Sequence, residues 1–175
     1  MQYRIIIFVG ILVVSQIATA NAVTKIGIGS GALETGATTR GPATTAALSY
    51  QWTLNPLLSV QGSYHMFWRN HSAGPIDFLH LTHRLTIDAT VAFQNSRLFG
   101  SVGVGVSPYL TQIKLNTTNA PESGHLLMGF GGHLGGCAGV MLTPSLGLGL
   151  LLEGFNRGAL FDANAQVVFR ISGES

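Results

Sequence analysis

The chain has 175 residues, which is enough for one domain rather than two. Beyond residue 22 it carries 8 Lys and Arg against 7 Asp and Glu. This near-balance gives no electrostatic argument for nucleic acid or for an acidic partner, so no nucleic-acid partner is expected. Cys137 is the single cysteine, which excludes an intramolecular disulfide, a zinc-binding cysteine cluster and a CxxC redox motif.

The first residues have the pattern of a secretory signal peptide. Arg4 supplies a positive charge, residues 5–14 form an apolar block, and an A-x-A cleavage site ends at Ala22. A membrane-anchor helix is the alternative, but this block is much shorter than the roughly 20 residues that span a bilayer. We therefore expect a cleaved signal peptide over residues 1–22 and a mature domain over residues 23–175.

Apolar and polar residues alternate with period two through most of the mature chain, and no stretch is convincingly helical. In residues 45–54, for example, the even positions are apolar and most of the odd positions are polar. Asn55 and Pro56 then force a turn, because proline cannot continue a strand ladder. The eight predicted strands cover residues 24–31, 45–54, 58–68, 78–93, 98–112, 125–142, 146–153 and 161–171.

Three features favour a transmembrane barrel over a soluble sandwich. The polar faces hold small or uncharged residues with few Lys and Glu, which suits a crowded interior better than a surface in water. Several strands match the roughly 9–11 tilted residues that cross a bilayer. Short connections (55–56, 94–97 and 143–145) alternate with long loops (32–43, 69–77 and 114–124), as in outer-membrane barrels.

The aromatic residues agree with this interpretation, because Trp52 and Phe93 lie on the apolar face beside short turns and Trp68 beside a long loop. A sheet in lipid must close, since open edges leave amides unsatisfied. The predicted fold class is therefore all-β: a closed up-and-down antiparallel eight-stranded transmembrane β-barrel. Eight strands leave an interior that side chains just fill, so a wide pore is not expected.

This pattern resembles the small eight-stranded outer-membrane barrels of the OmpX and OmpA type over the whole mature chain. The resemblance implies location in the outer membrane of a Gram-negative-type cell. It also implies contact with outer-membrane lipid and lipopolysaccharide, and insertion by the barrel-assembly machinery. Such barrels commonly end on an aromatic residue. Here Phe169 fits the strand pattern, but residues 171–175 extend beyond it.

Several ionisable residues fall on the face predicted to point into the barrel. We expect them to form a buried network of ion pairs and hydrogen bonds that plugs the lumen, because an unpaired buried charge is costly. A gated path for protons or small solutes is the alternative. The residues are His65, Arg84, Asp88, His133, Glu153 and Arg170.

A catalytic site was tested against the lipid A deacylases, which are also eight-stranded barrels and use a Ser-His pair with a carboxylate. Their H-x-S-N segment lies near the end of the seventh strand, where residues 153–160 here contain neither His nor Ser. His71 and Ser72, with Asp77 nearby, form the adjacent His/Ser pair of this chain and lie in a predicted loop. No catalytic residue is therefore assigned.

Neither a metal ion nor a cofactor is expected from the sequence. His80 and His83 fall on opposite faces of one strand and cannot chelate a metal together. His83 is then predicted to face lipid. The glycines of residues 129–139 are not followed by a helix, so they do not match a phosphate-binding loop.

The leading hypothesis is a non-enzymatic surface barrel whose long loops contact the exterior, lipopolysaccharide or an extracellular ligand. The first alternative is a lipid A-modifying outer-membrane hydrolase with a site at the rim that uses His71, Ser72 or Glu153. The second is a periplasmic ligand-binding barrel of the lipocalin type, which requires an apolar interior.

Overall fold

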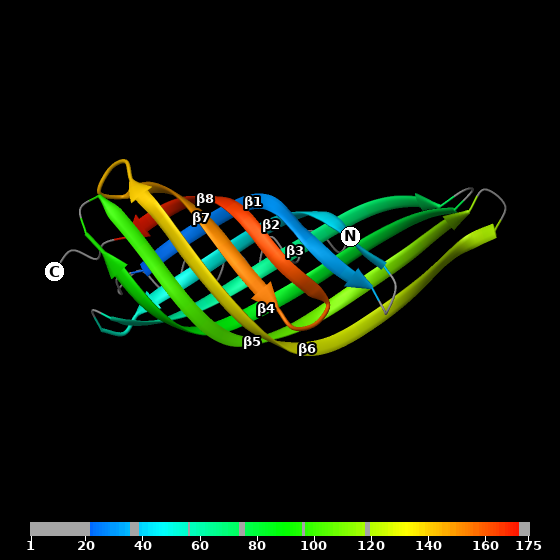
Figure 1. Ribbon diagram of the computed structural model, residues 1–175, viewed down its shortest axis with the longest axis horizontal. Coiled ribbons are helices and arrows are strands. Elements are labelled where there is room, and N and C mark those ends of the chain that lie inside the picture. Colours follow the sequence, from blue (N-terminus) through cyan, green and yellow to red (C-terminus); the bar gives the residue numbers. More distant parts are fainter. Residues whose placement is uncertain are drawn as a thin grey trace.

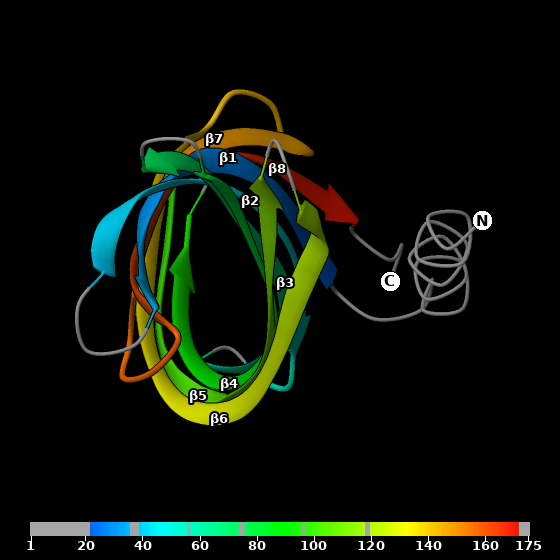
Figure 2. The same cartoon turned by 90° about the vertical axis from the view of Figure 1, so that its right-hand side faces the viewer.

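The computed structural model describes residues 22–35, 39–55, 57–73, 76–95, 97–117 and 120–171. Each strand pairs antiparallel with the next, and β1 pairs with β8 to close the barrel (Figure 1 and Figure 2). The predicted fold class is confirmed. The strands are β1 (Ala22–Thr35), β2 (Thr39–Thr53), β3 (Leu58–Ala73), β4 (Ile76–Gln94), β5 (Leu98–Thr117), β6 (Ala120–Met141), β7 (Leu146–Phe155) and β8 (Ala159–Ile171).

The predicted signal peptide lies outside the described residues except for Ala22, which is the first residue of β1. Its cleavage therefore stays a prediction. Within the described ranges, no helix is long and apolar enough to cross a membrane.

The barrel carries apolar side chains outside and polar side chains inside. Val104 is 61% exposed and Leu150 is 64% exposed, whereas Arg84 and His65 are completely buried. The buried polar and charged side chains are Lys25, Thr45, Ser49, Gln51, Ser59, Gln61, Ser63, His65, Thr82, Arg84, Thr86, Asp88, Thr90, Ser107, Thr111, His133, Glu153, Asp162, Asn164 and Gln166. A water-soluble domain has the opposite distribution, so this exterior matches a hydrocarbon environment.

The two ends of the barrel differ. At one end, which we call the turn end, β2–β3, β4–β5 and β6–β7 are joined through residues 54–57, 95–97 and 142–145. At the other end, the hairpin end, the β3–β4 and β5–β6 hairpins reach furthest beyond the closed wall (Figure 1). The β6–β7 ladder begins only at His133, so the preceding part of β6 pairs with β5 alone.

The predicted long loops at 32–43, 69–77 and 114–124 are wrong in their extent. Strand pairing continues almost to the tips, with Ala73 opposite Ile76 and Thr117 opposite Ala120. At 69–77 and 114–124 the physical reason is that water reaches both faces of a strand beyond the closed wall, whereas Leu33 and Ala43 are buried inside it. The apolar and polar alternation that marks a strand in the sequence is then absent, although the backbone ladder persists.

The outward apolar surface predicts a depth-dependent cost for charge. Val104→Arg should lower the free energy of unfolding in lipid vesicles by about 2–4 kcal/mol, because Val104 lies midway along the apolar wall. Thr143→Arg, in the exposed β6–β7 turn, is the matched control and should cost at most about 1 kcal/mol. Reversible unfolding in guanidinium chloride measures both, and equal costs would contradict an outward lipid-facing wall.

Candidate functional site

The lumen is filled in three layers along its axis, as the inward side chains of β7 show. These are Leu151, Glu153 and Phe155, in order from the turn end to the hairpin end. The apolar cluster nearer the turn end consists of Phe99, Cys137, Leu151 and Val168. The apolar cluster nearer the hairpin end consists of Leu33, Ala43, Phe67, Phe155 and Ala159. Glu153 therefore lies between two apolar clusters along the axis.

Five ionisable side chains meet at the level of Glu153, and we call them the polar layer: His65, Asp88, His133, Glu153 and Asp162. Nδ1 of His65 lies 3.1 Å from Oδ2 of Asp162 and 3.2 Å from Oε2 of Glu153. Because β3 supplies His65 while β7 and β8 supply the two carboxylates, this contact crosses the lumen.

The second histidine of the polar layer continues the chain of contacts. Nδ1 of His133 lies 2.7 Å from Oδ1 of Asp88, and its Nε2 lies 3.1 Å from Oε1 of Glu153. The Thr86 hydroxyl donates a hydrogen bond of 3.0 Å to the other Asp88 oxygen. Glu153 thus stands between two imidazoles, and the Phe155 ring stacks on that of His133 at 4.9 Å.

Arg84 lies one layer nearer the hairpin end. Its guanidinium donates hydrogen bonds to the Ser107 hydroxyl at 2.6 Å and to the Arg157 carbonyl in the β7–β8 turn. It also lies over the Phe155 ring, 4.2 Å from the ring centre, and over the Tyr109 ring at 5.0 Å. These contacts give the buried cation polar and aromatic partners and tie the β7–β8 turn to the wall.

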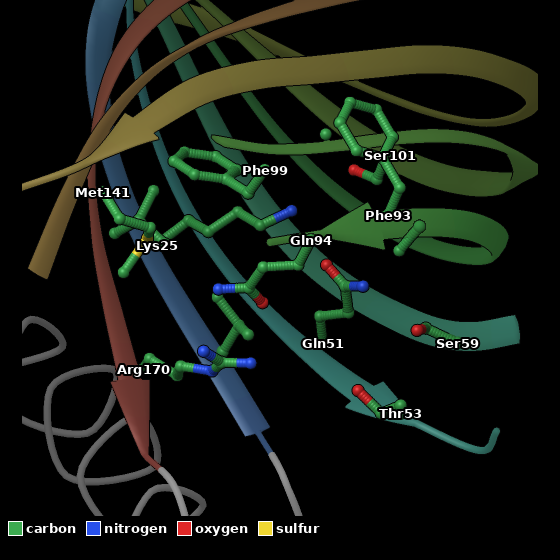
Figure 3. Close-up of a pocket in the computed structure, with 14 residues that line it drawn as sticks. Lys25, Gln51, Thr53, Ser59, Phe93, Gln94, Phe99, Ser101, Met141 and Arg170 are labelled. Atoms are coloured by element: carbon green, nitrogen blue, oxygen red, sulfur yellow. The ribbon is translucent and has the colours of Figure 1, made fainter. Parts of the chain in front are cut away.

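A cavity of about 290 Å³ opens at the turn end (Figure 3). Figure 3 shows Lys25 and Phe99 among its lining side chains, with Arg170 on β8 close to the beginning of β1. The Lys25 ammonium donates a hydrogen bond of 2.9 Å to the Gln61 side chain. Phe99 belongs to the apolar cluster that separates this cavity from the polar layer.

The structure places the six predicted interior residues at three levels. His65, Asp88, His133 and Glu153 meet in the polar layer, and Arg84 lies one layer nearer the hairpin end, against Phe155 of the second apolar cluster. Arg170 is exposed and does not join them. In the alternation of β8 it falls on the same side as the inward-facing residues. However, it is the penultimate residue of that strand, where the barrel opens.

Sequence reasoning missed two ionisable members of the interior. Asp162 is completely buried and accepts a hydrogen bond of 2.7 Å from the Thr45 hydroxyl. The alternation of β8 places Asp162 on the inward face, but the sequence does not show which residues it meets across the lumen. Lys25 was missed because β1, rich in glycine, has the weakest alternation in the chain.

The residues considered for catalysis are not brought together. The Ser72 hydroxyl donates a hydrogen bond of 2.6 Å to Asp77, while the His71 ring stacks on Phe78 instead. Glu153 is buried inside the barrel, away from this exposed hairpin. This arrangement gives no Ser-His-carboxylate site.

His83 points outward as predicted and has a polar partner there. Its Nδ1 lies 2.5 Å from the Tyr64 hydroxyl on β3, and both side chains are half-buried. A hydrogen bond of this kind explains how an imidazole is accommodated on an apolar wall.

Comparisons with known proteins give structural matches alone. No protein-family model and no curated protein sequence matches the chain. A crystal structure of Ail, the attachment invasion locus protein of Yersinia pestis, in complex with the heparin analogue sucrose octasulfate matches with a TM-score of 0.64 and 12% identity, over 87% of this chain and 98% of that one.

Two further structures agree with the first. The N-terminal β-barrel domain of Pseudomonas aeruginosa OprF has a TM-score of 0.59 and 15% identity, over 86% of this chain and 98% of that one. Neisserial surface protein A has a TM-score of 0.53 and 16% identity, over 87% and 96%. The fold is that of the small eight-stranded outer-membrane β-barrels.

The polar layer predicts strong coupling between its members. In a double-mutant cycle, His133→Gln and Asp88→Asn should show a coupling energy of about 1–3 kcal/mol, because each variant leaves the other group buried without its partner. The control cycle uses Ser72→Ala and Asp77→Asn, whose contact is equally short but exposed, and should give less than about 0.5 kcal/mol. Unfolding free energies in detergent micelles supply both values. Similar coupling in the two cycles would show that burial adds nothing to the Asp88–His133 contact.

Proposed function

We propose that the protein is a non-enzymatic β-barrel of the outer membrane of a Gram-negative-type cell, with a plugged lumen and surface hairpins that bind an external ligand. The observation that carries this proposal is the closed barrel with an apolar exterior and a polar, ionisable interior. Such a surface needs lipid around it, and closure satisfies the backbone hydrogen bonds that lipid cannot.

The asymmetry of the two ends supports an orientation. Short turns face the periplasm and longer hairpins face the exterior in outer-membrane barrels. On that basis, the turns at 54–57, 95–97 and 142–145 are periplasmic and the β3–β4 and β5–β6 hairpins are extracellular. Outer-membrane lipid, lipopolysaccharide and the barrel-assembly machinery are then the expected partners of the wall.

The layered interior supports a structural and binding role rather than transport. The cavity at the turn end is lined by none of the five residues of the polar layer, and an apolar cluster lies on either side of that layer. The same polar interior argues against a lipocalin-like barrel, which needs an apolar cavity. For the lipid A hydrolase, the His71, Ser72 and Glu153 positions give no supporting geometry.

The hairpin end carries basic residues that a ligand could contact. Lys114 and Arg157 are exposed there and Arg69 is half-buried, while Asp77 is already bonded to Ser72. The structure of Ail with a heparin analogue is a precedent for a polyanion on a barrel of this shape. We therefore name sulfated polysaccharide as the ligand class to test.

If the lumen is plugged, the protein should not conduct ions across a membrane. Purified protein in a planar lipid bilayer should give no sustained ion conductance, because buried side chains fill the lumen and the cavity at the turn end is not lined by the polar layer. A general porin in the same membrane controls for insertion and recording. Stable channel openings from this protein would overturn the plugged-lumen part of the proposal.

The surface hairpins predict where ligand binding resides. Replacing residues 114–124 by Asn-Gly should reduce binding to immobilised heparin at least tenfold while leaving heat-modifiable gel mobility intact, because Ile113 and His125 are paired and a two-residue turn can join them. Replacing residues 143–145 at the turn end by Asn-Gly is the matched control. Equal binding by the two variants, or no binding by the intact protein, would contradict a polyanion ligand at the hairpin end.

A further inference from the structure

His65 faces two carboxylates with a single nitrogen. Its Nδ1 lies 3.1 Å from Asp162 Oδ2 and 3.2 Å from Glu153 Oε2, and the side chains of all three are at most 1% exposed. An imidazole nitrogen carries at most one hydrogen, so one N–H cannot donate a well-formed bond to both oxygens. One of the two carboxylates is therefore left short of a partner.

Glu153 is that carboxylate. Among the described residues, neither of its oxygens has a hydrogen-bond partner, although each lies within ion-pair distance of an imidazole. The two buried cations direct their hydrogen bonds elsewhere, Lys25 to Gln61 and Arg84 to Ser107 and a backbone carbonyl. A buried carboxylate without a satisfied partner is costly, and a bound cation removes that cost.

We propose that His65, Glu153 and Asp162 bind a divalent transition-metal ion, with Zn²⁺ as its representative. The three ligand atoms all lie within 4.8 Å of one another. Ligand atoms of a tetrahedral zinc ion are separated by about 3.3 Å, given bond lengths near 2.0–2.1 Å. The two nitrogen-to-oxygen distances match that separation.

The groups behind the ligands hold them in this arrangement. The Thr45 hydroxyl donates a hydrogen bond to Asp162 Oδ1, while Asp162 Oδ2 faces His65. His133, itself held by Asp88, lies against Glu153 Oε1 and leaves Oε2 directed at His65. Metal ligands in proteins are commonly oriented by outer polar contacts of this kind.

The donor set defines the class of ion. One imidazole and two carboxylates suit zinc and neighbouring first-row metals, whereas Ca²⁺ takes six to eight oxygen ligands and Mg²⁺ keeps several waters. Because the ligands come from β3, β7 and β8, the ion joins opposite walls of the barrel. Its role is then to stabilise the plugged lumen.

The test uses tag-free mature protein refolded in detergent with Zn²⁺ and then passed through a desalting column. Folded protein should retain one equivalent of zinc by mass spectrometry, and X-ray absorption at the zinc edge should show one imidazole with oxygen ligands. At a free Zn²⁺ concentration of 100 times Kd, the ratio of folded to unfolded protein should rise about 100-fold.

Variants locate the ion. Glu153→Gln and Asp162→Asn should lose the retained zinc, whereas His83→Gln on the outer wall and Asp77→Asn in the exposed hairpin should keep it. Heat-modifiable gel mobility reports whether each variant has folded. If neither ligand variant folds, the zinc content, absorption spectrum and zinc-dependent stability of the unmodified protein decide the question.

Two results would overturn the proposal. One is folded, unmodified protein that retains no zinc and whose unfolding midpoint does not move with Zn²⁺, Mn²⁺ or Ni²⁺. The other is zinc retained equally by folded Glu153→Gln and Asp162→Asn, which places the metal elsewhere. Neither result affects the proposed surface role, which is tested at the hairpin end.

Discussion

Hydrocarbon offers no hydrogen-bond partners, so every backbone amide and carbonyl that crosses a membrane must be satisfied within the protein. Eight antiparallel strands meet this constraint only because β1 and β8 pair, from Ala22 opposite Ile171 to Leu33 opposite Ala159. Closure also fixes which side of each strand is enclosed. The outward positions can then be apolar throughout, and the polar residues have the lumen as their place.

A lumen of this size has room for side chains and little else. Burying three carboxylates in it is expensive. For Asp88 and Asp162 the cost is offset locally by two imidazoles and by the hydroxyls of Thr45 and Thr86, whereas Glu153 has no hydrogen-bond partner among the described residues. Arg84 is held apart from them, and its contacts are the Ser107 hydroxyl, a turn carbonyl and two aromatic rings. The proposed metal site follows from this arrangement of charges.

The strand pattern could be predicted from the sequence because lipid and lumen impose opposite polarity on alternate residues. Where both faces meet water, as around Ser72 and Asp77, that signal disappears and the paired tips were interpreted as loops. The alternation also predicts which side chains point into the lumen. The level of each residue along the axis depends on the stagger between strands, so the isolation of Arg170 and the partnership of Asp162 with His65 required the structure.

The central claim is that lipid surrounds the apolar wall while the polar side chains are enclosed. Solution NMR of the protein in lipid nanodiscs with a lipid-soluble paramagnetic probe tests this residue by residue. The side-chain signals of Val104, Leu150 and Ile87 should broaden strongly, and those of Thr86 and Gln166 should stay sharp. Broadening of the inward set with protection of the outward set would contradict the account and would require the apolar faces to form the core of a soluble protein.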